Sequence, residues 1–293
     1  MMGNEEIKFF EVAISDGKRK GYVYAPSSLE HPRSNTVIFV TPDYIDKYKN
    51  LLQVKGCLIF WPDAYPVPDE ISAIHILVTC AKPRLEFARF FKENALQEVT
   101  LERQDSMDLD RFDGRNITVM PNTYIGKDVV IGDDVYIGSG VRLVGKIHIG
   151  NNVIIRENSV LGADGLSFER DGDGMIITIP QFGGIIIEDD VIIGANVVIA
   201  RGAIDNTVIQ KGCVIDNGCF VSHNVILEEN VAIVGESIIF GSCHIGKNSF
   251  ISGNVTMRDN RRVGRNSFIG MGSVVLKNVE EENIVYGNPA TVK

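Results

Sequence analysis

An aliphatic residue recurs every six positions through the second half of the chain, and this period restricts the fold more than any other feature. The first run has eight such anchor residues over 119–161, without a miss. The period returns over 187–199 and, after a ten-residue step, continues with twelve more anchors over 209–275. A short, fixed period predicts a solenoid, in which each repeat buries its apolar face by stacking on the next one.

Each six-residue repeat offers two inward positions. The first is the anchor, and the second is a small or β-branched residue four positions later, as at Val135, Val197 and Cys213. Glycine often follows the anchor, where a corner needs a sharp turn. Only five of the 29 glycines precede residue 118, so the chain changes character there. We therefore expect short strands separated by corners over residues 117–280.

Three irregularities interrupt the period, and insertions are where a solenoid builds its sites. Within the first, residues 167–179 have the pattern of strand, turn and strand, so we expect an extruded loop over 163–186 that forms a hairpin. The second is the ten-residue step from Ile199 to Ile209. In the third, Arg261 occupies a position that should point inward, which suggests a local bulge.

The first hundred residues lack the repeat. Apolar runs at 36–40, 57–60 and 74–78 predict strands, and the apolar spacing over 84–95 predicts a helix with Pro83 in its first turn. We expect a small α/β domain over 1–100 that binds a nucleotide sugar, a linker over 101–116 and a C-terminal tail over 281–293.

Charge and composition exclude several functions. The formal charge of -9 offers no basic field for nucleic acid or an anionic membrane. Neither a long apolar run nor a signal-peptide pattern is present, so we expect a cytoplasmic protein. The five cysteines form no CxxC pair, and we expect buried reduced thiols, no metal and no permanently bound cofactor.

The repeat resembles that of the hexapeptide-repeat left-handed β-helix proteins. The resemblance implies that three hexapeptides make one triangular coil, so that residues 18 apart lie above one another at the spacing of neighbouring strands, about 4.8 Å. It also implies the left-handed winding, against the usual rule for parallel crossovers. Such solenoids usually pack as homotrimers with clefts between the subunits, and we expect a homotrimer here.

His223 is the strongest candidate for chemistry in the solenoid. It lies outside the inward positions, and histidine is the usual base near neutral pH. Gly241 lies one coil above it and leaves a backbone N–H uncovered beside whatever the imidazole touches. A base and an oxyanion donor one strand spacing apart are what acyl transfer needs. Asp216, Asn217 and Asp205 are polar candidates to orient the imidazole, and each equally fits a solvated coil residue.

Several motifs make the resemblance more specific. They occur in the same order as in the UDP-3-O-acylglucosamine N-acyltransferase family of lipid A synthesis, which the sequence resembles over most of its length. The motifs are Val-Leu-Gly-Ala-Asp-Gly at 160–165, Ile-Pro-Gln at 179–181, Arg-Gly-Ala-Ile-Asp-Asn-Thr-Val-Ile at 201–209, Ile-Asp-Asn at 215–217 and Ser-His-Asn at 222–224, with further likeness at 39–44 and 82–89.

The resemblance implies transfer of a (3-hydroxy)acyl group from the 4′-phosphopantetheine thioester of acyl carrier protein to the amine of a UDP-linked glucosamine derivative. It implies that His223 is the general base, that Asp216 supports it and that Gly241 N–H stabilises the oxyanion. The expected substrate-binding residues are Asn217, Asn224, Asn260, Phe39 and Tyr44, of which the two aromatic residues would hold the uracil ring.

Departures from the family keep other readings open. A second active-site histidine of the family falls at Asn260, the chain ends at Lys293 without the family's helical extension, and residues 286–290 are typical of hexapeptide enzymes that use coenzyme A. The alternative is therefore a coenzyme A-dependent N-acyltransferase acting on a dTDP- or UDP-linked dideoxy amino sugar. A zinc enzyme would need His148, His223 and His244 to converge, although they differ in hexapeptide phase. A non-catalytic scaffold is the last alternative.

Overall fold

The computed structural model describes residues 8–17, 19–94, 96 and 112–292, and these divide into two compact units. The larger unit holds the described residues of 112–165 and 183–292. The smaller unit holds the described residues before 97 together with Leu166–Phe182. Of the expected linker over 101–116, only residues 112–116 lie within the described part of the chain.

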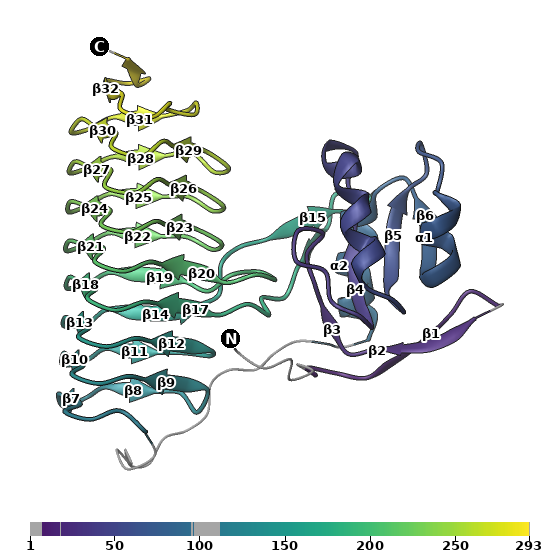
Figure 1. Ribbon diagram of the computed structural model, residues 1–293, viewed down its shortest axis with the longest axis horizontal. Coiled ribbons are helices and arrows are strands. Elements are labelled where there is room, and N and C mark those ends of the chain that lie inside the picture. Colours follow the sequence, from purple (N-terminus) through teal and green to yellow (C-terminus); the bar gives the residue numbers. More distant parts are fainter. Residues whose placement is uncertain (1–7, 18, 95, 97–111, 293) are drawn as a thin grey trace. The chain divides into compact units, whose positions relative to one another are not determined.

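The larger unit is a triangular parallel β-helix, whose stacked coils are seen in Figure 1. Its described strands form three sheets of ten, eight and seven strands, here called the ten-, eight- and seven-strand faces. Successive coils pair in register, as Ile215 does with Ile233. The predicted solenoid and its 18-residue coil are therefore present.

The ten-strand face consists of β7 (Thr118–Val119), β10 (Tyr136–Ile137), β13 (Ile154–Ile155), β18 (Ile192–Ile193), β21 (Val214–Ile215), β24 (Ala232–Ile233), β27 (Phe250–Ile251), β30 (Phe268–Ile269), β32 (Ile284–Tyr286) and β33 (Thr291–Val292). The eight-strand face consists of β8 (Tyr124–Ile125), β11 (Arg142–Leu143), β14 (Val160–Ala163), β19 (Val198–Ala200), β22 (Phe220–Val221), β25 (Ile238–Ile239), β28 (Thr256–Met257) and β31 (Val274–Val275). The seven-strand face consists of β9 (Val129–Ile131), β12 (Ile147–Ile149), β17 (Ile185–Ile187), β20 (Thr207–Ile209), β23 (Ile226–Leu227), β26 (His244–Ile245) and β29 (Arg262–Val263).

The core of the helix consists of the two inward positions of each repeat. Anchors such as Ile215 and Leu227 are fully buried, and burying one such side chain is worth about 1.5–3 kcal/mol. The residue four positions after an anchor points inward beside a carbonyl of the next coil. Cys213 Sγ therefore donates to Glu228 O over 3.0 Å, which explains why a small side chain with a polar hydrogen fits there.

Two of the three predicted irregularities are real insertions. Leu161 pairs directly with Ile199, with a register shift just after Leu161, so the segment between them leaves the coil. Ile187 pairs with Ile209, which extrudes the extra residues after β19. The bulge expected at Arg261 is wrong, because β26 and β29 pair without a shift. Arg261 Nε instead donates to Asp259 O over 3.0 Å, so the arginine side chain does not have to fit into the core.

The C-terminal boundary also differs from expectation. The sequence placed a tail over 281–293, whereas β32 pairs in parallel with β30 and continues the ten-strand face. The reason is that Val285, 2% exposed, extends the column of buried anchors. β33 then folds back antiparallel to β32.

The smaller unit is built on a four-stranded parallel sheet, and the apolar runs predicted three of its strands. Its strands are β3 (Ala25–Pro26), β4 (Thr36–Phe39), β5 (Leu58–Pro62) and β6 (Ile76–Cys80), and an antiparallel pair is formed by β1 (Val12–Ser15) and β2 (Lys20–Val23). The helices are the 3-10 helix η1 (Pro42–Gln53), α1 (Asp69–Ile74) and α2 (Pro83–Glu93), of which only α2 was predicted.

The extruded hairpin forms as predicted but belongs to the smaller unit. β15 (Phe168–Arg170) pairs antiparallel with β16 (Ile176–Thr178), and both strands contact α2. Phe182 closes the segment, with its ring centroid 5.0 Å from Phe91 and 5.4 Å from Phe9. Because Phe182 is part of this aromatic core, it is not free to cover a ligand as an exposed loop residue would be.

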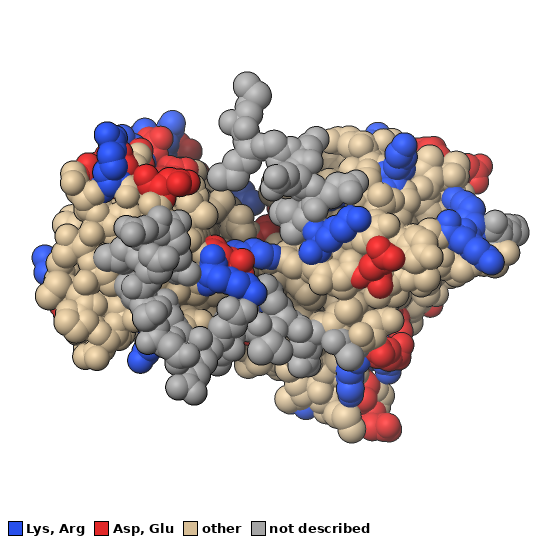
Figure 2. Space-filling view, turned by 90° about the horizontal axis from the view of Figure 1, so that it is seen from below, with Lys and Arg blue, Asp and Glu red and all other residues tan. Residues whose placement is uncertain are grey.

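Acidic and basic side chains are interspersed on the molecular face that Figure 2 shows. The broad positive area that nucleic acid would need is not seen on that face. No helix in the described part of the chain has the length and apolarity needed to cross a bilayer.

Candidate active site at the His223 corner

His223 lies at the corner between the eight- and seven-strand faces, just after β22, and is half-buried. Both real insertions leave the coil at this same corner, after β14 and after β19. The expectation that the irregularities mark a site is therefore supported by geometry for two of the three.

Asn224 orients the imidazole. Its Nδ2 donates to Asp205 O over 2.8 Å, while its Oδ1 accepts the N–H of Ala203 over 3.0 Å, so the orientation of the amide is fixed. The same Oδ1 lies 3.1 Å from His223 Nδ1 and can only accept. Nδ1 must then carry the proton in the neutral ring, which leaves the Nε2 lone pair free to act as a base.

Two glycines hold the ring from opposite edges. A Cβ added to Gly241 would lie 2.7 Å from both Cε1 and Nε2 of His223. A Cβ added to Gly165 would lie 2.6 Å from Cδ2. Real Cβ atoms do not approach this closely, so only glycine at both positions lets the imidazole occupy this place.

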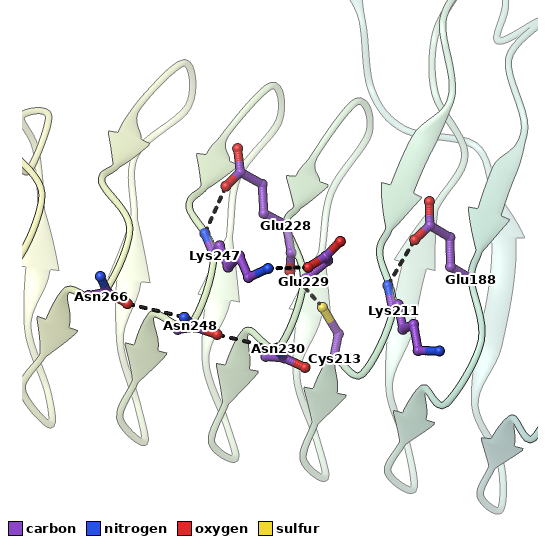
Figure 3. Close-up of polar contacts among 9 residues, drawn as sticks. All are labelled: Glu188, Lys211, Cys213, Glu228, Glu229, Asn230, Lys247, Asn248 and Asn266. Carbon is purple, nitrogen blue, oxygen red and sulfur yellow. Dashed lines mark hydrogen bonds and ion pairs between the residues drawn. The ribbon is translucent and has the colours of Figure 1, made fainter.

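The backbone N–H of Gly241 has no hydrogen-bond acceptor among the described residues. Figure 3 shows two residues, Lys211 and Lys247, that stand two positions after an anchor as Gly241 does, but at the corner between the seven- and ten-strand faces. There, Glu188 Oε2 accepts the N–H of Lys211 over 3.0 Å and Glu228 Oε2 accepts that of Lys247 over 2.8 Å. The N–H of Gly241 differs from these two in being uncapped, and it lies beside the imidazole, as the predicted oxyanion site requires.

A buried arginine lies beneath the site. Arg201 is 1% exposed, and its Nε donates to Asp164 Oδ1 over 2.7 Å. Asp164 directly precedes Gly165 in the chain, so the ion pair fixes the segment that touches the imidazole.

Asp216 and Asn217 do not reach His223 within the chain. Asp216 accepts the N–H groups of Asn217 and Gly235, and Asn217 Oδ1 accepts that of Ala195. Both residues lie at the corner between the ten- and eight-strand faces and line an open groove of about 420 Å³. Within the chain it is Asn224 that contacts the imidazole, and the role that the resemblance assigned to Asp216 stays a prediction.

The other expected substrate-binding residues lie in different places. Asn224 is occupied by the contacts that fix the imidazole, so its side chain is not free for substrate. Asn260 lies on the site's own corner, where its N–H donates to Gly241 O over 2.9 Å. Phe39 and Tyr44 belong to the smaller unit: Phe39 packs on Phe87 with centroids 4.9 Å apart, whereas Tyr44 is 49% exposed.

Nothing in the described part of the chain gathers three possible metal ligands. His244 Nε2 instead lies 2.6 Å from Glu228 Oε1, and His148 lies on β12 of the seven-strand face. The nearest thiol to His223 along the chain, Cys219, is buried, and burial raises its pKa to about 11.

Sequence reasoning predicted the stacking of Gly241 on His223, which the structure shows, but it did not anticipate the contacts of Gly165 and Asn224 with the imidazole. Gly165 stands at the root of the first insertion, and Asn224 follows the base in the chain. Two signals in the sequence pointed to these residues. Gly165 is a glycine where the repeat is interrupted, and Asn224 is an amide directly after the candidate base.

The repeats place the chain in a recognisable class. Residues 114–145 and 128–163 match the family model of the bacterial transferase hexapeptide (six repeats), and residues 178–201 and 184–223 match that of the hexapeptide repeat of succinyl-transferase. Together with the fold, these matches show hexapeptide repeats wound into a left-handed parallel β-helix, as predicted.

Within that class, the chain is similar to UDP-3-O-acylglucosamine N-acyltransferases, as its motifs indicated. It is 40% identical over 185 residues to that enzyme of Fusobacterium nucleatum, covering 56% of this chain and 53% of the relative. It is 34% identical over 133 residues to that of Delftia acidovorans, covering 45% of this chain and 34% of the relative. The chain thus spans about half or less of these relatives.

Solved structures agree on the fold. The UDP-N-acetylglucosamine acyltransferase from Campylobacter jejuni superposes with a TM-score of 0.56 at 20% identity, covering 61% of this chain and 68% of that one. A second UDP-N-acetylglucosamine acyltransferase gives a TM-score of 0.53 at 20% identity, covering 64% and 73%.

Proposed function

We propose that this chain is an N-acyltransferase that moves a (3-hydroxy)acyl group from the 4′-phosphopantetheine thioester of acyl carrier protein to the amine of a UDP-linked glucosamine derivative. The observation that carries the proposal is the pairing of a fixed imidazole with an uncapped N–H one coil above it. The names of the sequence relatives support the substrate class.

In the proposed reaction, the amine nitrogen attacks the thioester carbonyl carbon while His223 Nε2 removes a proton from it. The carbonyl oxygen becomes an oxyanion, which Gly241 N–H stabilises. When the tetrahedral intermediate collapses, the carbon–sulfur bond breaks. The imidazolium then returns its proton to the departing thiolate, which leaves an amide and a free thiol.

The assembly we propose is a homotrimer in the cytoplasm. The ten-strand face supports contact between copies, because large apolar side chains stand exposed on it. Phe250 and Phe268 are 40% and 41% exposed and stack with their centroids 5.4 Å apart. Asp216 and Asn217, which lie away from the base in their own chain, would then contribute to clefts that adjoining copies form. Asn260, Phe39 and Tyr44 remain our proposed contacts for the nucleotide sugar.

The first test is release of thiol by the purified protein, with acyl carrier protein or coenzyme A donors of several acyl lengths crossed with UDP- and dTDP-linked amino sugars. We expect turnover with a 3-hydroxyacyl carrier protein and UDP-3-O-acylglucosamine. His223→Gln should lose about 10²- to 10⁴-fold in kcat, as removal of a general base does. Near-normal turnover by this variant would exclude His223 as the base.

One observation favours coenzyme A as the donor. The resemblance places a second family histidine at position 260, where this chain has asparagine, and Asn260 Nδ2 donates to Asp259 Oδ2 over 2.7 Å. The same assay distinguishes the two functions. Turnover only with short acyl-coenzyme A and a dideoxy amino sugar would establish the alternative.

A further inference from the structure

We infer that the Asp164–Arg201 ion pair is a positioning device for the base: it holds Gly165 against the imidazole, so that His223 keeps one rotamer and one tautomer. The catalytic part of this inference rests on the proposed function. Neither Asp164 nor Arg201 reaches the imidazole itself, and both act through Gly165.

Stacking places Arg201 under the base. Ile199 pairs with Val221, so the residues two positions further on, Arg201 and His223, occupy the same corner position in adjacent coils. Arg201 N–H donates to Ala163 O over 3.0 Å, and its Nε bonds the next residue, Asp164, over 2.7 Å. Arg201 therefore forms hydrogen bonds with both residues that directly precede Gly165, Ala163 and Asp164.

Residues 162–165 lie where the regular pairing between the coils ends. This segment begins at Gly162, which has a left-handed φ of +92°, and a register shift in the β14–β19 pairing separates Leu161 from Ala163. Directly after Gly165 the chain enters the smaller unit, and it rejoins the β-helix only at Gly183. The ordinary ladder of strand hydrogen bonds thus ends just before the residue that must touch the imidazole, and the ion pair continues the attachment.

Arginine suits this task better than an apolar residue or lysine. A buried charge is costly unless it is well paired, so a guanidinium in the wall of an otherwise apolar helix indicates a specific partner. Its planar, multi-donor head fixes direction as well as distance, which a lysine ammonium does not. Asp164 is the exposed end of the pair, since 59% of its side chain is accessible.

The contact that results is tight. Besides Cδ2 at 2.6 Å, a Cβ on Gly165 would meet His223 Cβ at 2.8 Å and Cγ at 2.9 Å. Gly165 therefore borders the root of the side chain, whereas Gly241 borders its tip. With Asn224 on Nδ1, the ring is held on three sides, and loosening the Gly165 side frees rotation about the Cβ–Cγ bond.

The test compares Asp164→Asn and Gly165→Ala with Gly172→Ala in the hairpin turn, where an added Cβ meets nothing within 4 Å. Asp164→Asn is the primary variant because asparagine keeps an oxygen that can accept from Arg201 Nε. Thermal unfolding is measured alongside, because the buried guanidinium loses its charged partner. The readouts are kcat and KM, and the tautomer of His223 by ¹⁵N NMR of the imidazoles. His223→Gln assigns the signal among the five histidines.

We expect the wild type and Gly172→Ala to show a single neutral tautomer with the proton on Nδ1. Both site variants should show mixed tautomers and lose about ten- to a hundredfold in kcat with KM nearly unchanged, since small misplacements of a catalytic group have effects of this size. An unchanged tautomer in Asp164→Asn would overturn the inference. If the wild type turns over no donor while the tautomer still changes in the variants, the proposed function fails and the positioning role stands.

Discussion

Gly241→Ala is the most informative single change, because one added carbon tests the contact between the base and the oxyanion donor. The new Cβ would lie 2.7 Å from Cε1 and Nε2 of His223, whereas ordinary contacts begin at 3.4 Å. The ring must therefore move by about 0.7 Å. Gly165 blocks the far edge, so the movement lengthens the 3.1 Å contact between Nδ1 and Asn224 Oδ1.

A displacement of this size should lower kcat by about 10²-fold, which corresponds to about 2.7 kcal/mol in the activation free energy. Gly241 has no left-handed φ, so alanine adds no backbone strain and the melting temperature should change little. Thiol release gives kcat and KM. Gly253→Ala is the matched control on the same helix, because its Cβ would have only ordinary contacts, the nearest at 3.4 Å. A Gly241→Ala kcat within about threefold of wild type would refute the reasoning, because a 1 Å misplacement is expected to cost far more.

Three further predictions concern stability and thiol reactivity. Burial lowers the pKa of His75 from 6.5, so the unfolded state binds more protons, and the smaller unit should lose stability as the pH falls below 6.5, by at most about 1.4 kcal/mol per pH unit. Urea unfolding followed by the fluorescence of Trp61, the single tryptophan, at pH 7.5 and 5.5 checks this, and equal pH dependence in His75→Gln would contradict it. Ile215→Ala removes a fully buried anchor and should cost about 2–5 kcal/mol of unfolding free energy in chemical denaturation, and a loss below about 1 kcal/mol would count against the stacked core. Burial raises the pKa values of Cys213 and Cys219 to about 11, so a disulfide reagent at pH 7.5 should label neither thiol before unfolding, and rapid labelling of the native protein would disprove this.

The repeat could be predicted because a solenoid repeats one local rule. Each anchor is chosen by the same buried environment, so a period of six placed the strands and the corners. The resemblance to three-sided β-helices added the 18-residue stacking of His223 with Gly241. The paired strands of the hairpin followed from its turn residues. These are features that depend on contacts between near neighbours or between successive coils.

Features that depend on side-chain choice at one place were missed. Arg261 broke the apolar pattern, yet its aliphatic stem and its bond to Asp259 O let the coil continue without a bulge. Asn224 was expected to bind substrate, but the insertion after β19 surrounds its amide with backbone partners. The repeat period does not predict the conformation of an inserted loop. The orientation of the imidazole, which depends on such a loop, could therefore not be predicted from the period.

The stacked coil also separates two kinds of change. Adding or removing a complete coil of 18 residues keeps every strand on its own face, as the in-register ladder Asn230–Asn248–Asn266 in Figure 3 shows. An insertion of any other length keeps the faces aligned only if the extra residues leave the coil at a corner, and both real insertions do so at the His223 corner. The β-helix can thus gain or lose whole coils without disturbing the residues around His223. Conversely, the loops at the His223 corner can change without altering the length of the β-helix.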